Sequence, residues 1–341
     1  MTSDRLISIP ITPQAQLIAS WQEHAAHLTS LSPVSGQQLQ QESPDAHWML
    51  VRDDRELVAR CSLWWNATPP LEDHRVGAIG HYGAVDAPAG EQLLHHACQE
   101  LSDRGCTIAI GPMNGNTWRS YRLICDRGSE PIFFLEPNNP EDWPRHFTAQ
   151  QFTPIAQYSS AVNTDLSQSD PRLERVRDRL EKLGIHIRNL EIEHFETELQ
   201  RIYTIASVSF RQNFLYTPIS AEEFIAQYQK IRPYLRPEFI PIATHRDQPI
   251  GFLFALPDWL EAERDPAIHT IIIKTVAVLP GRQYAGLGNL FVAQCQETAK
   301  EMGYTRAIHA LMHDANPSRN LSDRYAKTIR RYALFAKPLN P

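Results

Sequence analysis

One segment of the 341-residue chain has residue types and spacing suited to binding a phosphorylated ligand. It reads VLPGRQYAGLG at residues 278–288, and it follows a nearly unbroken apolar, β-branched run. Glycines at 286 and 288 let the backbone approach a ligand without Cβ atoms in the way. A helix beginning directly after the loop adds free N–H groups and a partial positive charge. We therefore predict that this loop cradles a pyrophosphate.

Other phosphate-binding and catalytic patterns fit the chain less well. A dinucleotide-binding loop needs G-x-G-x-x-G, but the third glycine position here is Phe291. The G-K-[S/T] sequence of a Walker A loop and the G-x-S-x-G elbow of serine hydrolases are both absent from the sequence. Pairs of histidines occur, but no third ligand stands at a useful spacing, so we expect no metal site.

The loop resembles a motif of a known family. Gln283-x-x-Gly286-x-Gly288 is similar to motif A, Q/R-x-x-G-x-G/A, of the GCN5-related N-acetyltransferases (GNATs). The resemblance implies that the loop binds the pyrophosphate of acetyl-CoA or another acyl-CoA, the co-substrate, and that the preceding strand pairs with the pantetheine arm. It also implies an amine acceptor, either a small molecule or a peptide. The cofactor-binding residues implied are Val276, Val278, Gln283, Tyr284, Ala285, Gly286, Leu287, Gly288, Asn316, Ser318 and Arg319.

Direct acyl transfer to an amine also requires proton handling. A base takes the proton of the amine, and a donor protonates the leaving thiolate. The family often places a glutamate on the strand before the loop, where this chain has His269 and Lys274 instead. His269 and His309 are our candidate bases, with a structural role as the alternative for each. We interpret Lys274 as a solvated edge-facing residue, with a cavity residue as the alternative. Tyr325 is the candidate thiolate donor by its position after Asn316.

The elements that must position these residues follow from local periodicity in the second half of the chain. Alternating or continuous apolar runs predict strands, and apolar residues at helical spacing predict helices. Ser220 with Glu223 resembles a capping box that opens a helix. The expected strands are 185–190, 239–244, 250–256, 270–279 and 307–312, and the expected helices are 196–211, 221–231 and 287–302.

The first half appears in the sequence as a degenerate copy of the same order. Strands are expected at 48–52, 57–65, 76–82 and 107–111, with a helix at 91–104. The stretches around residues 77–86 and the sequence GPMN at 111–114 resemble tandem acetyltransferase-like proteins, and this resemblance covers the chain almost end to end. The loop equivalent to 278–288 is DAPAGE at 86–91, which carries two acids that would repel a pyrophosphate.

These observations predict an α/β (α+β) protein of two tandem GNAT-like domains, each a mixed, mostly antiparallel sheet flanked by helices. The polar segment LSQSDPR at 166–172 separates a degenerate domain, residues 1–165, from an acyltransferase domain, residues 172–341. We call these the first and second halves. The first half has a formal charge of −9 without a single lysine, and residues 166–341 have +3. An anionic ligand is therefore expected in the second half.

Composition narrows the class of protein further. A net charge of −6 disfavours a nucleic-acid binder, and the absence of an 18-residue apolar run disfavours a membrane span. Five cysteines without a CxxC pattern, and no secretory signal, favour a cytoplasmic protein with reduced thiols. We expect an N-acyltransferase, most simply an N-acetyltransferase. A longer-chain, fatty N-acyltransferase and a non-catalytic acyl-CoA-binding module remain open, as does the oligomeric state.

Overall fold

The structure is a computed structural model that describes residues 4–9, 31–53, 56–168, 170–315 and 326–339. Its first half contains seven strands and three helices in these residues. They are β1 (Asp4–Ile9), α2 (Gly36–Glu42), β2 (Ala46–Arg52), β3 (Glu56–Trp64), β4 (Val76–Ala84), α3 (Ala87–Asp103), β5 (Ile108–Gly111), β6 (Leu123–Asp126), α4 (Trp143–Ala149) and β7 (Thr153–Asn163).

The second half contributes six strands and four α-helices to the described part of the chain. They are α5 (Arg172–Lys182), β8 (Ile185–Asn189), α6 (Phe195–Ser209), α7 (Ala221–Gln229), β9 (Pro241–His245), β10 (Gln248–Pro257), β11 (Thr270–Val278), α8 (Leu287–Glu301), β12 (Arg306–His313) and β13 (Lys327–Pro338). Short 3-10 turns connect several of these elements.

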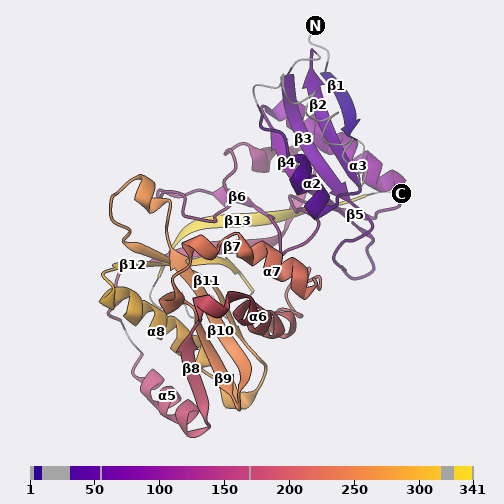
Figure 1. Cartoon of the computed structure of the whole chain (residues 1–341). Helices are drawn as coiled ribbons and strands as arrows, with labels where there is room; N and C mark the ends of the chain where they lie inside the picture. Colours follow the sequence, from indigo (N-terminus) through magenta and orange to yellow (C-terminus); the bar gives the residue numbers. More distant parts are fainter. Residues whose placement is uncertain (1–3, 10–30, 54–55, 169, 316–325, 340–341) are drawn as a thin grey trace.

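All thirteen strands belong to one sheet that runs through both halves (Figure 1). Its order is β1-β2-β3-β4-β5-β13-β7-β12-β11-β10-β9-β8, and β6 pairs with β13. The pairs β4–β5 and β11–β12 are parallel, and the other pairs are antiparallel. The mixed, mostly antiparallel fold class predicted from the sequence is confirmed, although the two expected sheets are joined edge to edge.

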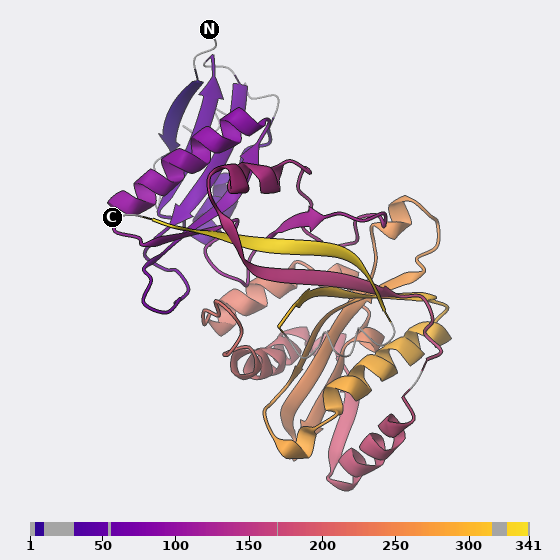
Figure 2. The same ribbon diagram turned by 180° about the vertical axis from the view of Figure 1, so that it is seen from behind.

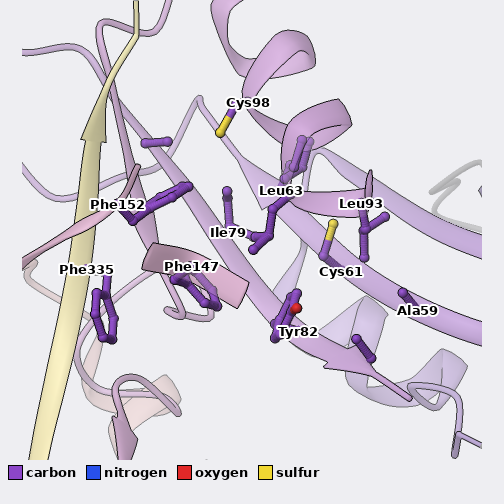
Figure 3. Packing of buried hydrophobic residues seen from close by; sticks show 14 of the residues in the cluster. Ala59, Cys61, Leu63, Ile79, Tyr82, Leu93, Cys98, Phe147, Phe152 and Phe335 are labelled. Atoms are coloured by element: carbon purple, nitrogen blue, oxygen red, sulfur yellow. The ribbon is translucent and has the colours of Figure 1, made fainter. Parts of the chain in front are cut away.

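Two long strands cross between the halves. β7 of the first half lies between β13 and β12, and β13 of the second half lies between β5 and β7 (Figure 2). β13 thereby brings Phe335 into the core of the first half, where its ring stacks on Phe147 at a centroid distance of 5.7 Å (Figure 3). Each half therefore needs a strand from the other to complete its sheet.

Helices cover both faces of the second-half sheet (Figures 1 and 2). The helix pair α6 and α7 buries apolar side chains of one face, and α8 buries those of the other. In the first half, α3 packs its apolar face, which includes Leu93, Ala97 and Leu101, over β3 and β4. No helix of the described ranges is long and apolar enough to cross a membrane.

The predicted local elements agree with the structure to within a few residues at their ends. The Ser220 hydroxyl accepts a hydrogen bond from the Glu223 N–H at 3.1 Å, which confirms the predicted cap of α7. The helix predicted over 91–104 starts earlier, at Ala87, because the Asp86 carboxylate accepts from the Ala89 N–H and caps it.

Candidate functional site

The second half contains a split between its two parallel strands. β11 and β12 pair from Thr270 with Arg306 as far as Ile273 with His309, and then each strand continues alone to its end. Within the described residues, β11 pairs with no strand on its β12 side beyond Ile273, although the Val278 carbonyl oxygen accepts a hydrogen bond of 3.2 Å from the Ser209 hydroxyl of α6. The remaining N–H and C=O groups of this edge are available to an extended ligand, in the manner of an added strand.

A β-bulge lies at the vertex of this split. Opposite β10, Thr275 pairs with Phe254 and Ile273 pairs with Ala255, so Lys274 is the extra residue. The bulge changes the alternation of side chains along the strand. Ile271 and Ile273 before it, and Val276 and Val278 after it, all pack in the core that includes α8. Sequence periodicity could not show this change, because it assumes an uninterrupted period of two.

At the far end of β11, the loop leads directly into the N-terminus of α8. Gly286 precedes the helix with a φ of +86°, a left-handed conformation that favours glycine. No side chain of the described residues caps the helix, so the N–H groups of its first turn remain available. Gly288 follows in that first turn, where an added Cβ would lie 3.4 Å from Val276 Cγ1. The residues present therefore fit a pyrophosphate.

The helix α5 and the β9–β10 hairpin hold the loop in place. Arg179 of α5 donates hydrogen bonds to the carbonyl oxygens of Gln283 and Ala285. Val176 of the same helix packs beside Gly286. On the other side, Tyr284 Oη lies 3.2 Å from His245 Nδ1. Arg179 also adds a positive charge next to the uncapped helix end, which favours an anion there.

The cofactor-binding residues predicted from the sequence fall into two sets. Those on β11, in the loop and at the start of α8 come together at one end of the split: Val276, Val278, Gln283, Tyr284, Ala285, Gly286, Leu287 and Gly288. The others lie outside the described residues: Asn316, Ser318, Arg319 and the predicted thiolate donor Tyr325.

Neither candidate base is suited by its position to act at the split. His269 precedes β11 at the end opposite the loop, about 30 Å from Val278 along nine residues of strand. His309 is the last residue of β12 that pairs with β11, but its ring contacts Gln296 of α8. His309 is buried, with its Nε2 atom 3.0 Å from Gln296 Nε2 of α8. Burial lowers the pKa of His309 to about 4, which keeps the ring neutral at pH 7. A structural role fits the surroundings of His309 better than proton transfer at the split.

Lys274 differs from its interpretation as a solvated edge residue. Its side chain is half-buried, and Nζ donates a hydrogen bond of 2.9 Å to the carbonyl oxygen of Leu135 in the first half. Burial, followed by the positive charge of Arg122, lowers the pKa of Lys274 to about 7, against an opposing effect of Glu136. The bulge explains the difference, because it turns this side chain toward the first half instead of toward an open edge.

Residues of the first half line the split, and local sequence patterns gave no signal for them. We call residues 127–136 the strap. Buried Arg330 of β13 holds it through an ion pair with Glu136 at 2.7 Å and through bonds to three strap carbonyls. Beside it, the Arg122 guanidinium lies between the rings of Tyr121 and Tyr158, at 3.8 and 4.1 Å from their centroids. Arg122 also donates to the Leu311 carbonyl of β12 at 3.2 Å.

The equivalent split of the first half is filled by the protein itself. β4 and β5 pair as far as Ala78 with Ile110, and then the Met113 N–H donates to the carbonyl oxygen of Ile79 at 2.8 Å. The Asn114 side chain accepts from the next available N–H, that of His81, at 2.8 Å. Both bonds occupy edge positions that are open in the second half.

The helix end of the first half is occupied as well. The Asp86 carboxylate caps α3 and also accepts two hydrogen bonds of 3.1 Å from Arg52. The N-terminus of α3 is thus capped by a carboxylate, whereas the N-terminus of α8 has no side-chain cap. Of the two splits, only the one in the second half retains an open edge next to an uncapped helix.

Comparison with known proteins agrees with this arrangement. Residues 199–324 match the model of the acetyltransferase (GNAT) family. The match begins within α6, includes the loop and extends past the end of β12. On this match, the second half of the chain contains a GNAT-family segment.

Solved structures of similar fold cover the whole chain. A GCN5-related N-acetyltransferase from Sphaerobacter thermophilus is 14% identical with a TM-score of 0.51, over 98% of this chain and 96% of that one. A tandem GNAT protein from the clavulanic acid biosynthesis pathway is 12% identical with a TM-score of 0.50, over 99% of both chains. At these identities the likeness establishes the fold alone.

A curated relative adds a further comparison. A bacterial ceramide synthase from Caulobacter vibrioides is 24% identical over 200 residues, which are 58% of this chain and 51% of the relative. The chain therefore matches about half the length of that protein.

Proposed function

We propose that the protein is an N-acyltransferase that transfers an acyl group from acyl-CoA to a primary amine. The observation that carries this proposal is the open edge of β11, which leads from the split to the uncapped helix end at Gly286. Four residues of strand, about 13 Å, separate Lys274 from Val278. An extended arm along this edge would join the pyrophosphate at the loop to a thioester at the vertex.

In this proposal the two ends of the open edge, the loop and the vertex of the split, have different roles. The loop and the N-terminus of α8 bind the pyrophosphate by backbone N–H groups. A backbone N–H next to the split polarises the thioester carbonyl, and the amine attacks from the face that carries α6, α7 and the strap. The departing thiolate takes a proton, for which Tyr325 remains the proposed donor.

The acyl group is acetyl in the simplest form of the proposal. A longer chain is the second candidate, supported by the similarity to a ceramide synthase. A ceramide is an amide of a fatty acid and a long-chain amino alcohol, so that name denotes the same bond formed with longer partners. We also propose a cytoplasmic location, supported by the five cysteines, all of which are free thiols.

The proposal is tested by measuring free-thiol release from acetyl-, octanoyl- and palmitoyl-CoA with a panel of amines. The panel contains polyamines, amino acids, a lysine peptide and a long-chain amino alcohol, and mass spectrometry identifies the amide. We expect amine-dependent release with at least one pair. CoA binding without release in any pair would instead indicate the acyl-CoA-binding module. A protein that does not bind CoA at all would contradict both functions.

A further inference from the structure

Lys274 has a position and surroundings that the sequence did not predict. It is the extra residue of the bulge, directly after the last paired residue of β11, Ile273. Its side chain points away from the core beneath α8, where Ile273 and Val276 pack. It lies instead on the face where the strap crosses, because Nζ bonds to the carbonyl oxygen of Leu135.

Two charged groups act on the Lys274 ammonium. Arg122 directly precedes β6, and Glu136 is in the strap. Glu136 raises the pKa of Lys274, but its carboxylate already accepts hydrogen bonds from Arg330 and Tyr332 of β13. The ammonium therefore has a carbonyl partner, a cation nearby and a carboxylate that is engaged elsewhere.

We propose that Lys274 is the general base that takes the proton from the acceptor amine, and that Arg122 of the first half is a positioning residue that keeps it ready to do so. In this step the neutral Nζ accepts one proton from the amine as the nitrogen attacks the thioester carbonyl. The new C–N bond forms, and the C–S bond breaks to release the CoA thiolate. The ammonium then returns the proton to solvent. This inference rests on the proposed acyl transfer.

The surroundings make this assignment chemically reasonable. A lysine of ordinary pKa is protonated at pH 7 and cannot act as a base. Burial and Arg122 lower the pKa of Lys274 to about 7, so that a large fraction is neutral there. The nearest rival is His313, which is half-buried and whose Nδ1 already accepts from the Ala315 N–H.

The first test measures the protonation of Lys274 without relying on activity. The chain has six lysines, so reductive methylation with ¹³C-formaldehyde followed by NMR titration gives six lysine signals and one from the α-amino group. Lys274→Arg identifies the signal of interest by its loss. We expect that signal to titrate near pH 7. A Lys274 that titrates near pH 10 would overturn the inference, and acyl transfer could still be correct.

The second test uses the pH profile of kcat/KM in the full-length protein. Lys274→Arg retains the positive charge and the donor to Leu135 but cannot lose its proton. We expect its rate to fall by about 10²-fold or more, with unchanged CoA affinity and melting temperature. Lys327→Arg, an exposed site, is the matched control and keeps full activity. A Lys274→Arg enzyme with wild-type rates would overturn the inference.

Variants of Arg122 test whether its charge sets the pH of the acid limb. A purely structural role of Arg122 would leave that pH unchanged. Arg122→Gln removes the positive charge, which raises the pKa of Lys274 and shifts the acid limb of the profile to higher pH. Arg122→Lys keeps the charge and leaves the limb near pH 7. Besides burial, Arg122 also lowers the pKa of His313, so the two bases are distinguished by their own variants. If the limb disappears in His313→Gln and persists in Lys274→Arg, His313 is the base and the inference is overturned. If Lys274 titrates near pH 7 but no amine is acylated, the proposed acyl transfer is wrong. In that case the assignment of Lys274 as its general base is wrong as well.

Discussion

The Met113 N–H donates a hydrogen bond of 2.8 Å to the carbonyl oxygen of Ile79, one residue beyond the point where β4 and β5 separate. The first half thus closes the edge that the second half leaves open at β11. An added Cβ on Gly80 would lie 2.5 Å from the Met113 carbonyl oxygen, so the two segments are in direct contact. The first half has no room for a pantetheine arm along this edge.

This closure predicts one CoA per chain. The first half also holds a carboxylate at its helix end and a charge of −9, both of which oppose a strongly anionic ligand. Calorimetry with a CoA analogue that cannot transfer its acyl group should give a stoichiometry of one. Two sites per chain, or half of the binding surviving in Gly286→Val, would show that the first half binds CoA.

Substitutions at Gly288 distinguish the effect of charge in the loop from the effect of side-chain size. Gly288→Asp adds a negative charge beside the pyrophosphate, and the loss of one or more charged hydrogen bonds, roughly 1.5–3 kcal/mol each, should weaken CoA binding at least about tenfold. The fold should not suffer, because an acid in the first turn stabilises a helix by about 0.3–1 kcal/mol. Gly288→Asn, of the same shape, is the control for charge. Equal CoA affinities for the two variants would contradict the loop assignment.

The loop and helix that we propose bind CoA could be predicted from the sequence because their signals are local. Pro280 ends a β-branched strand, and the two loop glycines and the periodic run after them mark the helix. The exchange of β7 and β13 has no such signal, since strand partners are chosen by tertiary packing between residues far apart in the chain. Arg122 and Leu135 reach the split for the same reason, from segments that have no regular periodicity.

His309 predicts a pH dependence of stability. Its pKa is about 4 in the folded protein, against about 6.5 when unfolded, so the folded state binds fewer protons between these values. The stabilisation is present above pH 6.5 and is lost as the pH falls toward 4. For a shift of this size the loss is on the order of 3 kcal/mol.

Urea unfolding between pH 7 and 4, followed by tryptophan fluorescence, measures this loss. His309→Gln removes the titrating group and should flatten the pH dependence by most of that amount. His269→Gln, at a less buried strand end, should leave the curve unchanged. An equal slope in wild type and His309→Gln would show that His309 is not the group responsible.

Arg330 and Arg331 are neighbours on β13 with opposite surroundings, and they form a matched pair for testing how the strap is held. Arg330 is buried in an ion pair with Glu136 in which both side chains have 0% exposure, whereas Arg331 is exposed. Removing one partner of such a pair leaves an uncompensated charge inside the protein. Arg330→Met should therefore lower the free energy of unfolding by about 3–5 kcal/mol, and Arg331→Met by less than about 0.5 kcal/mol.

The double variant Glu136→Gln with Arg330→Met distinguishes a lost charge partner from lost packing. With the acid neutralised, the penalty for a buried unpaired carboxylate disappears, so part of the stability should return. The Arg330 guanidinium also donates to the carbonyl oxygens of Glu130 and Pro131, at 3.0 and 2.9 Å, and those bonds are not restored. The double variant should therefore fall between wild type and Arg330→Met in urea unfolding. If it is no more stable than Arg330→Met, the carbonyl bonds hold the strap and the ion pair contributes little.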